Sequence, residues 1–499
     1  MDHIAGSLPS KYIGMNGKKL NLEFSERKLL LHGADALLVM LSLLGALWGW
    51  AKIAGLPLTL SLIQSQLYWI APVFFGWGAW LLLTDSYNLP LAARFRPTAA
   101  RILLGSIGVG FIYLLVFFLA SRTAVSEWLP DIVLGFSAMG EPLRFAPAAA
   151  ILASTCLLLL WRLAYVRLLC GPHMRVRVLI VGAGLAGRSL YTTITLHYSE
   201  HYTVVGYIDN DAEKQAMTLG TVSVLGTHSD LERVAWEQHV GEIVLAISRN
   251  VSPDLLPILM ACHERGLNVT PMPLLYERLT GKVAVEHIGT QWYVALPLQK
   301  QPADTAMRLI KRLMDIVGGL LLSLLFIVLL PILALAIKLE SPGPIFYQQE
   351  RLGRHGQTFR VYKLRSMTQD AEPEGVPQWA TPDDPRITRV GKWLRRTRLD
   401  EWPQAWNVLI GEMSLVGPRP ERPEFVEQLQ RAIPFYRTRL AAKPGLTGWA
   451  QINAGYGSSM AATLTKLQFD LYYLKHQSPW FDLFILARTI LVVLRLQGR

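Results

Sequence analysis

Four long apolar segments in the first third of the sequence are the feature that most restricts how this chain can fold. A helix that crosses the hydrocarbon core of a bilayer needs about 20 predominantly apolar residues. Each segment has that length, or nearly so, and the four lie at about 29–50, 67–84, 102–120 and 145–166. We therefore expect a four-helix transmembrane bundle. The alternative is a set of buried helices in a soluble domain.

Basic residues around these segments predict an orientation. The N-terminal tail is basic, and the loop after the second segment carries Arg94, Arg96 and Arg101. The exit from the fourth segment carries Arg162, Arg167, Arg175 and Arg177, whereas the other two loops are poor in Lys and Arg. Because cytoplasmic loops are enriched in Lys and Arg, both ends of the bundle are expected in the cytoplasm. No small-residue cleavage site follows the first segment, so we interpret it as a membrane anchor and not as a signal peptide.

Composition narrows the class of protein. The 499 residues are 51% hydrophobic, which is high for a soluble protein and low for one that lies wholly in a membrane. The net charge of +12 fits nucleic acid, an anionic membrane surface or a phosphate-rich substrate, and the apolar segments favour the last two. The three cysteines, Cys156, Cys170 and Cys262, have neither metal-ligand spacing nor a disulfide framework, which fits a cytoplasmic setting.

The segment RVRVLIVGAGLAGRSL (175–190) has the pattern of a strand, a glycine-rich turn and a helix. Gly182, Gly184 and Gly187 have the spacing that lets a backbone approach a phosphate at a helix N-terminus. Asp209 stands where a ribose-binding acid would be expected. More strand-like segments imply a parallel sheet, and they lie at 203–211, 241–248 and 267–273. These residues predict a Rossmann-like domain that either binds a nucleotide or serves as a scaffold that binds nothing.

A fifth apolar segment, 313–337, is long enough to span a membrane, but Pro331 interrupts it. Basic residues flank it on both sides, which suggests that both ends return to the same face of the membrane. A straight span is the alternative. The C-terminal segment 480–499 mixes apolar residues with arginines and predicts either an interfacial amphipathic helix or a core helix of the last domain.

The segment RLDEWPQAWNVL (398–409) places Asp400 and Glu401 side by side behind several arginines. The simplest interpretation is a helix start, with Asp400 as the N-cap. Basic and glycine-rich segments surround it in the sequence, however, and both kinds of segment bind phosphate. A carboxylate among phosphate ligands can hold Mg²⁺ or attack phosphorus to form an acyl phosphate. Neighbouring residues on a helix point in different directions, so the two acids need not share one role.

Residues from about 308 to 496 resemble the bacterial sugar transferase family, which are monotopic phosphoglycosyl transferases that act on polyprenyl phosphate. The matching motifs are KRLMDIV, YKLRSM, DPRIT, RxxxxDExPQxWNVL, GEMSLVGPRP and KPGLTGWAQI. The whole chain resembles the large members, such as undecaprenyl-phosphate glucose or galactose phosphotransferases. In these, four transmembrane helices and an α/β Rossmann-like domain precede an α-rich monotopic catalytic domain with a re-entrant membrane helix. The resemblance therefore implies a multi-domain membrane protein with a basic cytoplasmic tail (1–28), a transmembrane bundle (29–171), a cytoplasmic Rossmann-like domain (172–300), a re-entrant helix-hairpin (301–340) and a catalytic domain that ends in an interfacial helix (341–499).

The same resemblance implies an activity. A sugar-1-phosphate would pass from a UDP-sugar to polyprenyl (undecaprenyl) phosphate, giving polyprenyl-diphospho-sugar and UMP. Asp400 would form a covalent aspartyl-phosphosugar with Glu401 as its helper, Mg²⁺ held at Asp400 would neutralise the diphosphate, and Pro331 would break the membrane helix. Substrate phosphates would be bound by Lys363, Arg365, Arg386, Arg395 and Arg419. Such a reaction is the first membrane step of exopolysaccharide, capsule or O-antigen synthesis, at the cytoplasmic face of the bacterial inner membrane.

Two other functions remain open at this point. The glycine-rich domain could make the chain an NAD-dependent enzyme that modifies nucleotide sugars, although no evident Tyr–Lys pair at short spacing supports this. The same domain could instead be a nucleotide-sugar sensor that regulates the transferase. The expected partners are a UDP-sugar, polyprenyl phosphate and membrane lipid, with no nucleic acid, and a homodimer is left open. The sequence does not predict which sugar is transferred.

Overall fold

The computed structural model describes residues 24–120, 145–215, 217–247, 252–287, 305–368, 371, 384–454 and 459–494. The chain divides into two compact units, and each is described by itself. The N-terminal unit comprises Met1–Ala183, Gly187–Val244 and Pro253–Val269, and the C-terminal unit comprises Gly184–Ala186, Leu245–Ser252 and Thr270–Arg499. Most of the predicted basic tail and the segment 288–304, where the predicted Rossmann-like domain ends, lie outside the described residues.

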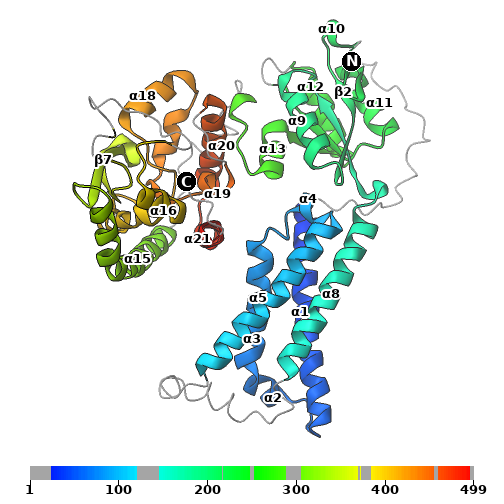
Figure 1. Cartoon of the computed structure of the whole chain (residues 1–499). Coiled ribbons are helices and arrows are strands. Elements are labelled where there is room, and N and C mark those ends of the chain that lie inside the picture. Colours follow the sequence, from blue (N-terminus) through cyan, green and yellow to red (C-terminus); the bar gives the residue numbers. More distant parts are fainter. Residues whose placement is uncertain are drawn as a thin grey trace, which may run out of the picture. The chain divides into compact units, whose positions relative to one another are not determined.

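The predicted bundle is present in the N-terminal unit as four long helices side by side (Figure 1): α1 (Phe24–Ile53), α3 (Leu67–Leu83), α5 (Phe95–Ala120) and α8 (Ala146–Leu169). Two short helices, α2 (Leu60–Ser65) and α4 (Leu89–Ala92), join them. Apolar side chains from all four long helices form one core, which includes Leu43, Trp69, Val109 and Leu158. Helices α1, α5 and α8 are long and apolar enough to cross a membrane, and α3, at 17 residues, is at the lower limit of spanning length.

One ion pair lies inside this apolar bundle. Asp35 of α1 accepts a hydrogen bond from Arg162 of α8, and both side chains are almost completely buried. An isolated charge in this apolar interior would have no partner. Here one charge of each sign is buried, and each is the partner of the other. The pair therefore links α1 to α8 at a fixed level along the two helices.

The sheet that follows has the strand order β3-β4-β2-β1-β5-β6. Strand β1 pairs in parallel with β2, and β2 pairs in parallel with β4, whereas the short β3 is antiparallel to β4. The four strands expected from the sequence correspond to β1, β2, β5 and β6, and the β3–β4 hairpin was not predicted. The elements are β1 (Val176–Val181), α9 (Leu185–His197), β2 (Tyr202–Ile208), α10 (Ala212–Gln215), β3 (Thr218–Leu219), β4 (Val222–Gly226), α11 (Leu231–Glu237), β5 (Glu242–Leu245), α12 (Leu255–Glu264) and β6 (Asn268–Pro271), with short 3-10 turns η3 (Pro172–Met174) and η4 (His228–Asp230).

The C-terminal unit is rich in helices and contains two small sheets, an antiparallel β7–β8 pair and a parallel β9–β10 pair. Its elements are α13 (Met272–Thr280), η5 (Val285–His287), α15 (Thr305–Glu340), β7 (Phe346–Leu352), η6 (Arg354–Gly356), β8 (Thr358–Leu364), α16 (Arg389–Thr397), η8 (Leu399–Gln404), α17 (Ala405–Ile410), β9 (Ser414–Val416), α18 (Pro423–Ala432), η9 (Tyr436–Ala441), β10 (Gly445–Thr447), α19 (Trp449–Asn453), α20 (Met460–His476) and α21 (Pro479–Leu494).

Helix α13 belongs to the C-terminal unit. Its Glu277 is buried and accepts hydrogen bonds from Lys475 (2.9 Å) and the ring of His476 (2.7 Å), both on α20. The indole N–H of Trp449 donates to the carbonyl of Gly281, just beyond α13. The segment that follows the last strand of the Rossmann-like sheet is therefore packed on the C-terminal unit.

Helix α15 contacts the rest of the C-terminal unit along most of its length. Near its start, Lys311 donates to Asp482 and Arg312 donates to carbonyls of α17. Its last residue, Glu340, accepts from the first backbone N–H groups of α16. The side chains that it buries are Asp315, Phe326, Leu333 and Ile337. The opposite face is apolar and exposed, with Leu313, Val317, Leu320, Leu321, Leu324, Leu325, Ile327, Val328, Ile332, Leu335 and Leu339.

The C-terminal helix α21 combines features of both interpretations of its sequence. Asp482 and Ile485 are buried in the unit, and Ile485 joins the core around β8 and β9. Trp480 and Ile490 on the same helix are mostly exposed. One side of α21 is thus core, and another side presents apolar groups to the surroundings.

Candidate active site

The acid pair lies on a short 3-10 helix between two α-helices. Helix α16 ends at Thr397. The next residue, Arg398, has a φ of 57° and a ψ of 17°, which place it in the left-handed region that is uncommon for a residue other than glycine. The chain then enters η8, which carries Asp400 and Glu401, and continues into α17. The N-cap position belongs to Arg398, and no side chain caps the helix. The simple interpretation of Asp400 as an N-cap is therefore wrong. Both acids are 7% exposed, so their charges must be balanced from within the protein.

Glu401 is balanced by two cations. Lys363 of β8 donates to its Oε1 at 3.0 Å, and Arg419, in the loop after β9, donates to its Oε1 at 2.5 Å and its Oε2 at 3.3 Å. Burial alone would raise the pKa of Glu401, but the charges of Arg419 and Lys363 and the hydrogen bond from Arg419 hold it well below its usual range. Glu401 is therefore the more acidic member of the pair, and it is bonded to two cations.

Asp400 has a different environment. None of the described side chains donates a hydrogen bond to its carboxylate. Burial raises its pKa, and the charge of Glu401 raises it further, while Lys363, Arg395 and Arg419 act in the opposite direction. The adjacent acids thus have different environments, and separate roles for them stay a prediction. Glu401 is held by cations, whereas Asp400 is the more basic carboxylate.

Arg395 completes the cationic surroundings of Asp400. Its Nε donates to the hydroxyl of Ser366 at 2.9 Å, which fixes the side chain beside the acid pair. Burial lowers the pKa of its guanidinium, and the charge of Asp400 opposes that change. Three of the predicted phosphate ligands, Lys363, Arg395 and Arg419, therefore surround the pair.

The other two predicted phosphate ligands have structural partners. Arg365 donates to the carbonyls of Pro342 (2.6 Å) and Ser341 (2.7 Å), directly after the end of α15. Arg386 forms a two-pronged pair with Asp384, at 2.8 and 2.6 Å. These contacts fix the end of α15 and the DPRIT turn. Phosphate binding by either arginine stays a prediction.

A glycine-rich junction holds the loop that carries Arg419. A methyl group on Gly445 would lie 2.0 Å from the backbone nitrogen of Gly417, and one on Gly448 would lie 2.2 Å from the carbonyl oxygen of Gly417. Backbone atoms cannot move aside as a flexible side chain can, so only glycine fits where the GPRP and KPGLTGW motifs meet. These motifs are brought together by the parallel pairing of β9 with β10.

Two arginines near this loop, the half-buried Arg351 and the buried Arg439, were missed by the sequence analysis. Arg351 of β7 donates to the carbonyl of Pro420, and Arg439 of η9 donates to the carbonyl of Arg419. Neither belongs to a motif that marks it out among the 49 Lys and Arg residues of the chain. Their burial depends on tertiary packing, which residue type alone does not reveal.

A cavity of about 20 Å³ adjoins the pair and is lined by Arg351, Lys363, Glu401, Gln404 and Arg419, among others. This volume holds little more than a water molecule, so it cannot enclose a nucleotide sugar. The side chain of Arg419 is 43% exposed. A large anionic ligand would therefore meet Arg419 from its exposed side.

The described residues contain no group of three or more His, Cys, Asp or Glu side chains that could hold a metal ion. Mg²⁺ does not require such a group, because it is commonly bound by one or two carboxylates together with substrate phosphates. Glu401 is occupied by Lys363 and Arg419, which leaves Asp400 as the available carboxylate. The chemistry of this carboxylate is compatible with a divalent cation that is bound together with a diphosphate, and Mg²⁺ binding at Asp400 stays a prediction.

The predicted nucleotide-binding residues lie at the start of the Rossmann-like sheet. Gly182 has a φ of 110°, which favours glycine, and a methyl group on Gly187 would lie 2.1 Å from the carbonyl oxygen of Gly182. The carboxylate of Asp209 accepts a hydrogen bond from the N–H of Ala183 at 2.8 Å. The Gly184 position is open. Asp209 thus supports the turn itself, and nucleotide binding there stays a prediction.

Comparison with known proteins matches two parts of the chain to family models. The model described as bacterial sugar transferase matches residues 306–496, and the one described as CoA-binding domain matches residues 83–273. The first match contains the acid pair and the cations around it.

Several characterised relatives are similar over this region. A UDP-N-acetylgalactosamine-undecaprenyl-phosphate N-acetylgalactosaminephosphotransferase of Aeromonas hydrophila is 42% identical over 47% of this chain and 54% of its own length. A UDP-glucose:undecaprenyl-phosphate glucose-1-phosphate transferase of Escherichia coli is 46% identical over 39% of this chain and 42% of its own length. A UDP-galactose-lipid carrier transferase of Erwinia amylovora is 31% identical over 64% of this chain and 68% of its own length.

The chain spans only about half the length of the first two relatives. The matched region nevertheless contains the acid pair, its cationic partners and the glycine-rich junction, and the Erwinia amylovora protein is matched over more than two thirds of its length. This chain belongs to the bacterial sugar transferase family.

Proposed function

We propose that this protein transfers a sugar-1-phosphate from a UDP-sugar to polyprenyl phosphate, giving polyprenyl-diphospho-sugar and UMP. The observation that carries the proposal is the buried acid pair with one unbonded carboxylate, Asp400, among Lys363, Arg395 and Arg419. The names of the relatives support it, since they describe transferases with a UDP-sugar donor or an undecaprenyl-phosphate acceptor. Those names differ in the sugar, so the proposal covers hexose phosphates as a class.

In the first step, an Asp400 oxygen attacks the β-phosphorus of the UDP-sugar. An O–P bond forms, the bond between that phosphorus and the bridging oxygen breaks, and UMP leaves with the electron pair. The raised pKa of Asp400 favours this step, because a more basic carboxylate is a better nucleophile. Arg395 and Arg419 are placed to bind the phosphates, where charge-assisted contacts favour the transition state.

In the second step, an oxygen of polyprenyl phosphate attacks the phosphorus of the aspartyl-phosphosugar, and Asp400 leaves as a carboxylate. Glu401 stays ionised throughout, because Lys363 and Arg419 hold its pKa low. It therefore fixes the two cations while Asp400 changes its bonding. Asp400 would also hold Mg²⁺, which would neutralise the charge of the diphosphate.

Helix α15 supports a re-entrant membrane segment. Between Lys311 and Glu340 a straight helix would extend roughly 44 Å, at 1.5 Å per residue. Both of these residues nevertheless bond to the same compact unit, and buried residues from Asp315 to Ile337 pack against it. A helix that crossed the bilayer and left by the opposite face would carry its second end away from that unit. Pro331 lies inside α15 and removes one backbone hydrogen bond where a bend would form.

The exposed apolar face of α15 would then lie in the membrane, which would place Asp400 near the level of lipid headgroups. The donor is a soluble nucleotide sugar, so the site would face the cytoplasm, in the bacterial inner membrane. A lipid phosphate and a soluble nucleotide could meet there without either leaving its own phase. The reaction would begin the assembly of an exopolysaccharide, capsule or O-antigen on its lipid carrier.

The test is a transfer assay on the purified full chain in detergent or lipid discs. UMP release would be measured with UDP-glucose, UDP-galactose and UDP-N-acetylgalactosamine, with and without undecaprenyl phosphate. The proposal predicts sustained UMP release with at least one donor, and only when the lipid phosphate is present. Absence of release with every donor would refute it, and reduction of added NAD⁺ with a nucleotide sugar would favour the NAD-dependent alternative.

A further inference from the structure

The backbone of the loop that carries Arg419 is fixed at four successive carbonyls. The carbonyl of Pro418 accepts from the N–H of Gly445 (2.9 Å), and that of Glu421 accepts from the N–H of Leu352 (3.0 Å). The carbonyls between them accept from side chains, that of Arg419 from Arg439 (2.9 Å) and that of Pro420 from Arg351 (3.3 Å). A loop bonded in this way has little freedom to change the direction of its side chains.

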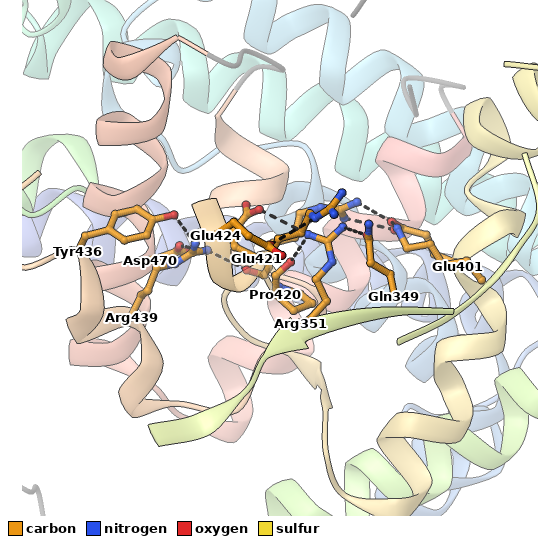
Figure 2. A network of polar contacts seen from close by, with 12 residues as sticks. Gln349, Arg351, Glu401, Pro420, Glu421, Glu424, Tyr436, Arg439 and Asp470 are labelled. Carbon is orange, nitrogen blue, oxygen red and sulfur yellow. Dashed lines mark hydrogen bonds and ion pairs between the residues drawn. The ribbon is translucent and has the colours of Figure 1, made fainter. Parts of the chain in front are cut away.

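Arg439, labelled in Figure 2, is more deeply buried than Arg351, the other side chain that donates to these carbonyls. Its side chain is 7% exposed, and its Nη1 donates to the hydroxyl of Tyr436 at 2.9 Å. Its Nη2 lies 2.8 Å from Asp470 of α20, whose side chain is 3% exposed. A buried guanidinium without a counter-charge would be costly, so Asp470 is what allows Arg439 to occupy this position.

In the described part of the chain, Arg439 bonds to Tyr436, Asp470 and the Arg419 carbonyl and not to the acid pair, so its effect on the pair must pass through Arg419. The carbonyl that it binds belongs to Arg419, and the Arg419 side chain donates to both oxygens of Glu401. Figure 2 shows this succession from Tyr436 and Asp470 on one side to Glu401 on the other. These contacts form a continuous path from the buried Arg439–Asp470 ion pair through Arg419 to Glu401 in the candidate active site.

We propose that Arg439, held by Asp470, is a positioning residue for the transfer reaction. It fixes the Arg419 backbone so that the Arg419 guanidinium meets Glu401 and the incoming phosphate in one arrangement. The inference rests on the proposed function, because its effect is read out through phosphate transfer. Small misplacements of a group that contacts the reacting phosphate are costly to the rate, which is why a distant arginine can matter.

The alternative is that Arg439 only supports the local fold. A double-mutant cycle separates the two, because residues that act through one another give non-additive effects. Arg439→Lys keeps a positive charge near Asp470 but loses the guanidinium fork that bonds Tyr436 and the Arg419 carbonyl together. Arg437→Lys is the matched control, because Arg437 lies two residues away in the same element and is exposed.

The experiment measures kcat, KM and the melting temperature of the full chain for Arg439→Lys, Arg419→Ala and the double variant. We expect Arg439→Lys to lower kcat on the order of 10-fold to 100-fold, with a smaller change in KM and a melting temperature near that of the wild type. In the Arg419→Ala background, the same substitution should change kcat by no more than about twofold. The control should match the wild type.

If Arg439→Lys does not fold, Arg439→Gln combined with Asp470→Asn removes both charges together and enters the same cycle. The proposal is overturned if the substitution at 439 leaves kcat unchanged, or if it lowers kcat by the same factor with and without Arg419. A wild-type protein that releases no UMP would overturn the proposed function and this inference with it. An active wild type with an additive cycle would overturn this inference alone.

Discussion

Replacing Glu401 with Gln changes one charge at the centre of the site and leaves the shape nearly unchanged. In the wild type, this carboxylate accepts from Lys363 at 3.0 Å and from Arg419 at 2.5 and 3.3 Å. The amide of Gln can accept from only one side and would turn its N–H₂ group toward the other cation. Hydrogen bonds to charged groups are worth about 1.5–3 kcal/mol each. We therefore expect Arg419 to lose its fixed position and the rate at pH 7 to fall by roughly 10²-fold or more.

The same variant makes a second, sharper prediction about pH. Burial raises the pKa of Asp400, and the charge of Glu401 adds to that effect. Asp400 must be ionised to attack, so activity should rise with pH through its pKa. Removing the Glu401 charge should move that rise to lower pH, because this charge is one of the two causes that raise the pKa of Asp400.

The assay is the pH dependence of kcat/KM for UMP release, measured for the wild type and for Glu401→Gln at constant ionic strength. The account predicts a slower enzyme whose acid limb lies at lower pH. An acid limb that stays in place or moves to higher pH would refute the assignment of Asp400 as the ionising nucleophile coupled to Glu401. Arg431→Gln is a suitable control, because Arg431 lies on the exposed side of α18 and pairs only with Glu427 among the described residues.

Three further predictions concern topology, stability and the Rossmann-like domain. Single cysteines at positions 305 and 348 in a cysteine-free background should both react with an impermeant thiol reagent from the cytoplasmic side only; labelling from opposite sides would show that α15 spans the membrane. The pKa of Asp470 is raised by burial to about 6, above its unfolded value near 3.9, so its stabilising contribution is complete below about pH 4 and is lost as pH rises through about 6. Asp470→Asn should therefore remove roughly 3 kcal/mol of the pH dependence of the unfolding free energy between pH 4 and 7, and an unchanged pH dependence of the melting temperature would contradict this. Gly184→Leu should fit, because the space around Gly184 is open, and should leave UMP release within about twofold of the wild type; loss of transfer in a folded variant would show that this domain takes part in the reaction.

The parts of the fold that were predictable are those with strong local patterns. Helices α1, α5 and α8 follow from predominantly apolar segments of about 20 residues, which is the length that a membrane-spanning helix needs. Strand β1, the glycine-rich turn and α9 follow from a buried strand next to glycines with a fixed spacing. The β3–β4 hairpin was not predictable, since Thr218–Leu219 and Val222–Gly226 are short and only partly buried.

The sequence was enough to select the residues of the candidate site, but it predicted only part of their spatial arrangement. The motif around Asp400 and Glu401 identified the pair. Its placement on a 3-10 helix depends on the left-handed conformation of Arg398, which no local sequence pattern predicts. Sequence reasoning could not separate the arginines that face the pair from those that bond to carbonyls. Arg365 and Arg439 are both buried arginines bonded to backbone carbonyls, one at the end of α15 and one behind Arg419. That distinction is made by tertiary packing alone.

The most direct test of the account is the detection of a covalent sugar phosphate on Asp400. The purified chain would be incubated with an accepted UDP-sugar in the absence of polyprenyl phosphate, quenched in acid and analysed by mass spectrometry. The account predicts a mass increase of one sugar phosphate on the wild type, located at Asp400, which disappears when polyprenyl phosphate is added. Asp400→Asn should fold and show neither the adduct nor turnover. Wild-type turnover in that variant, or an adduct located on another residue, would contradict the account.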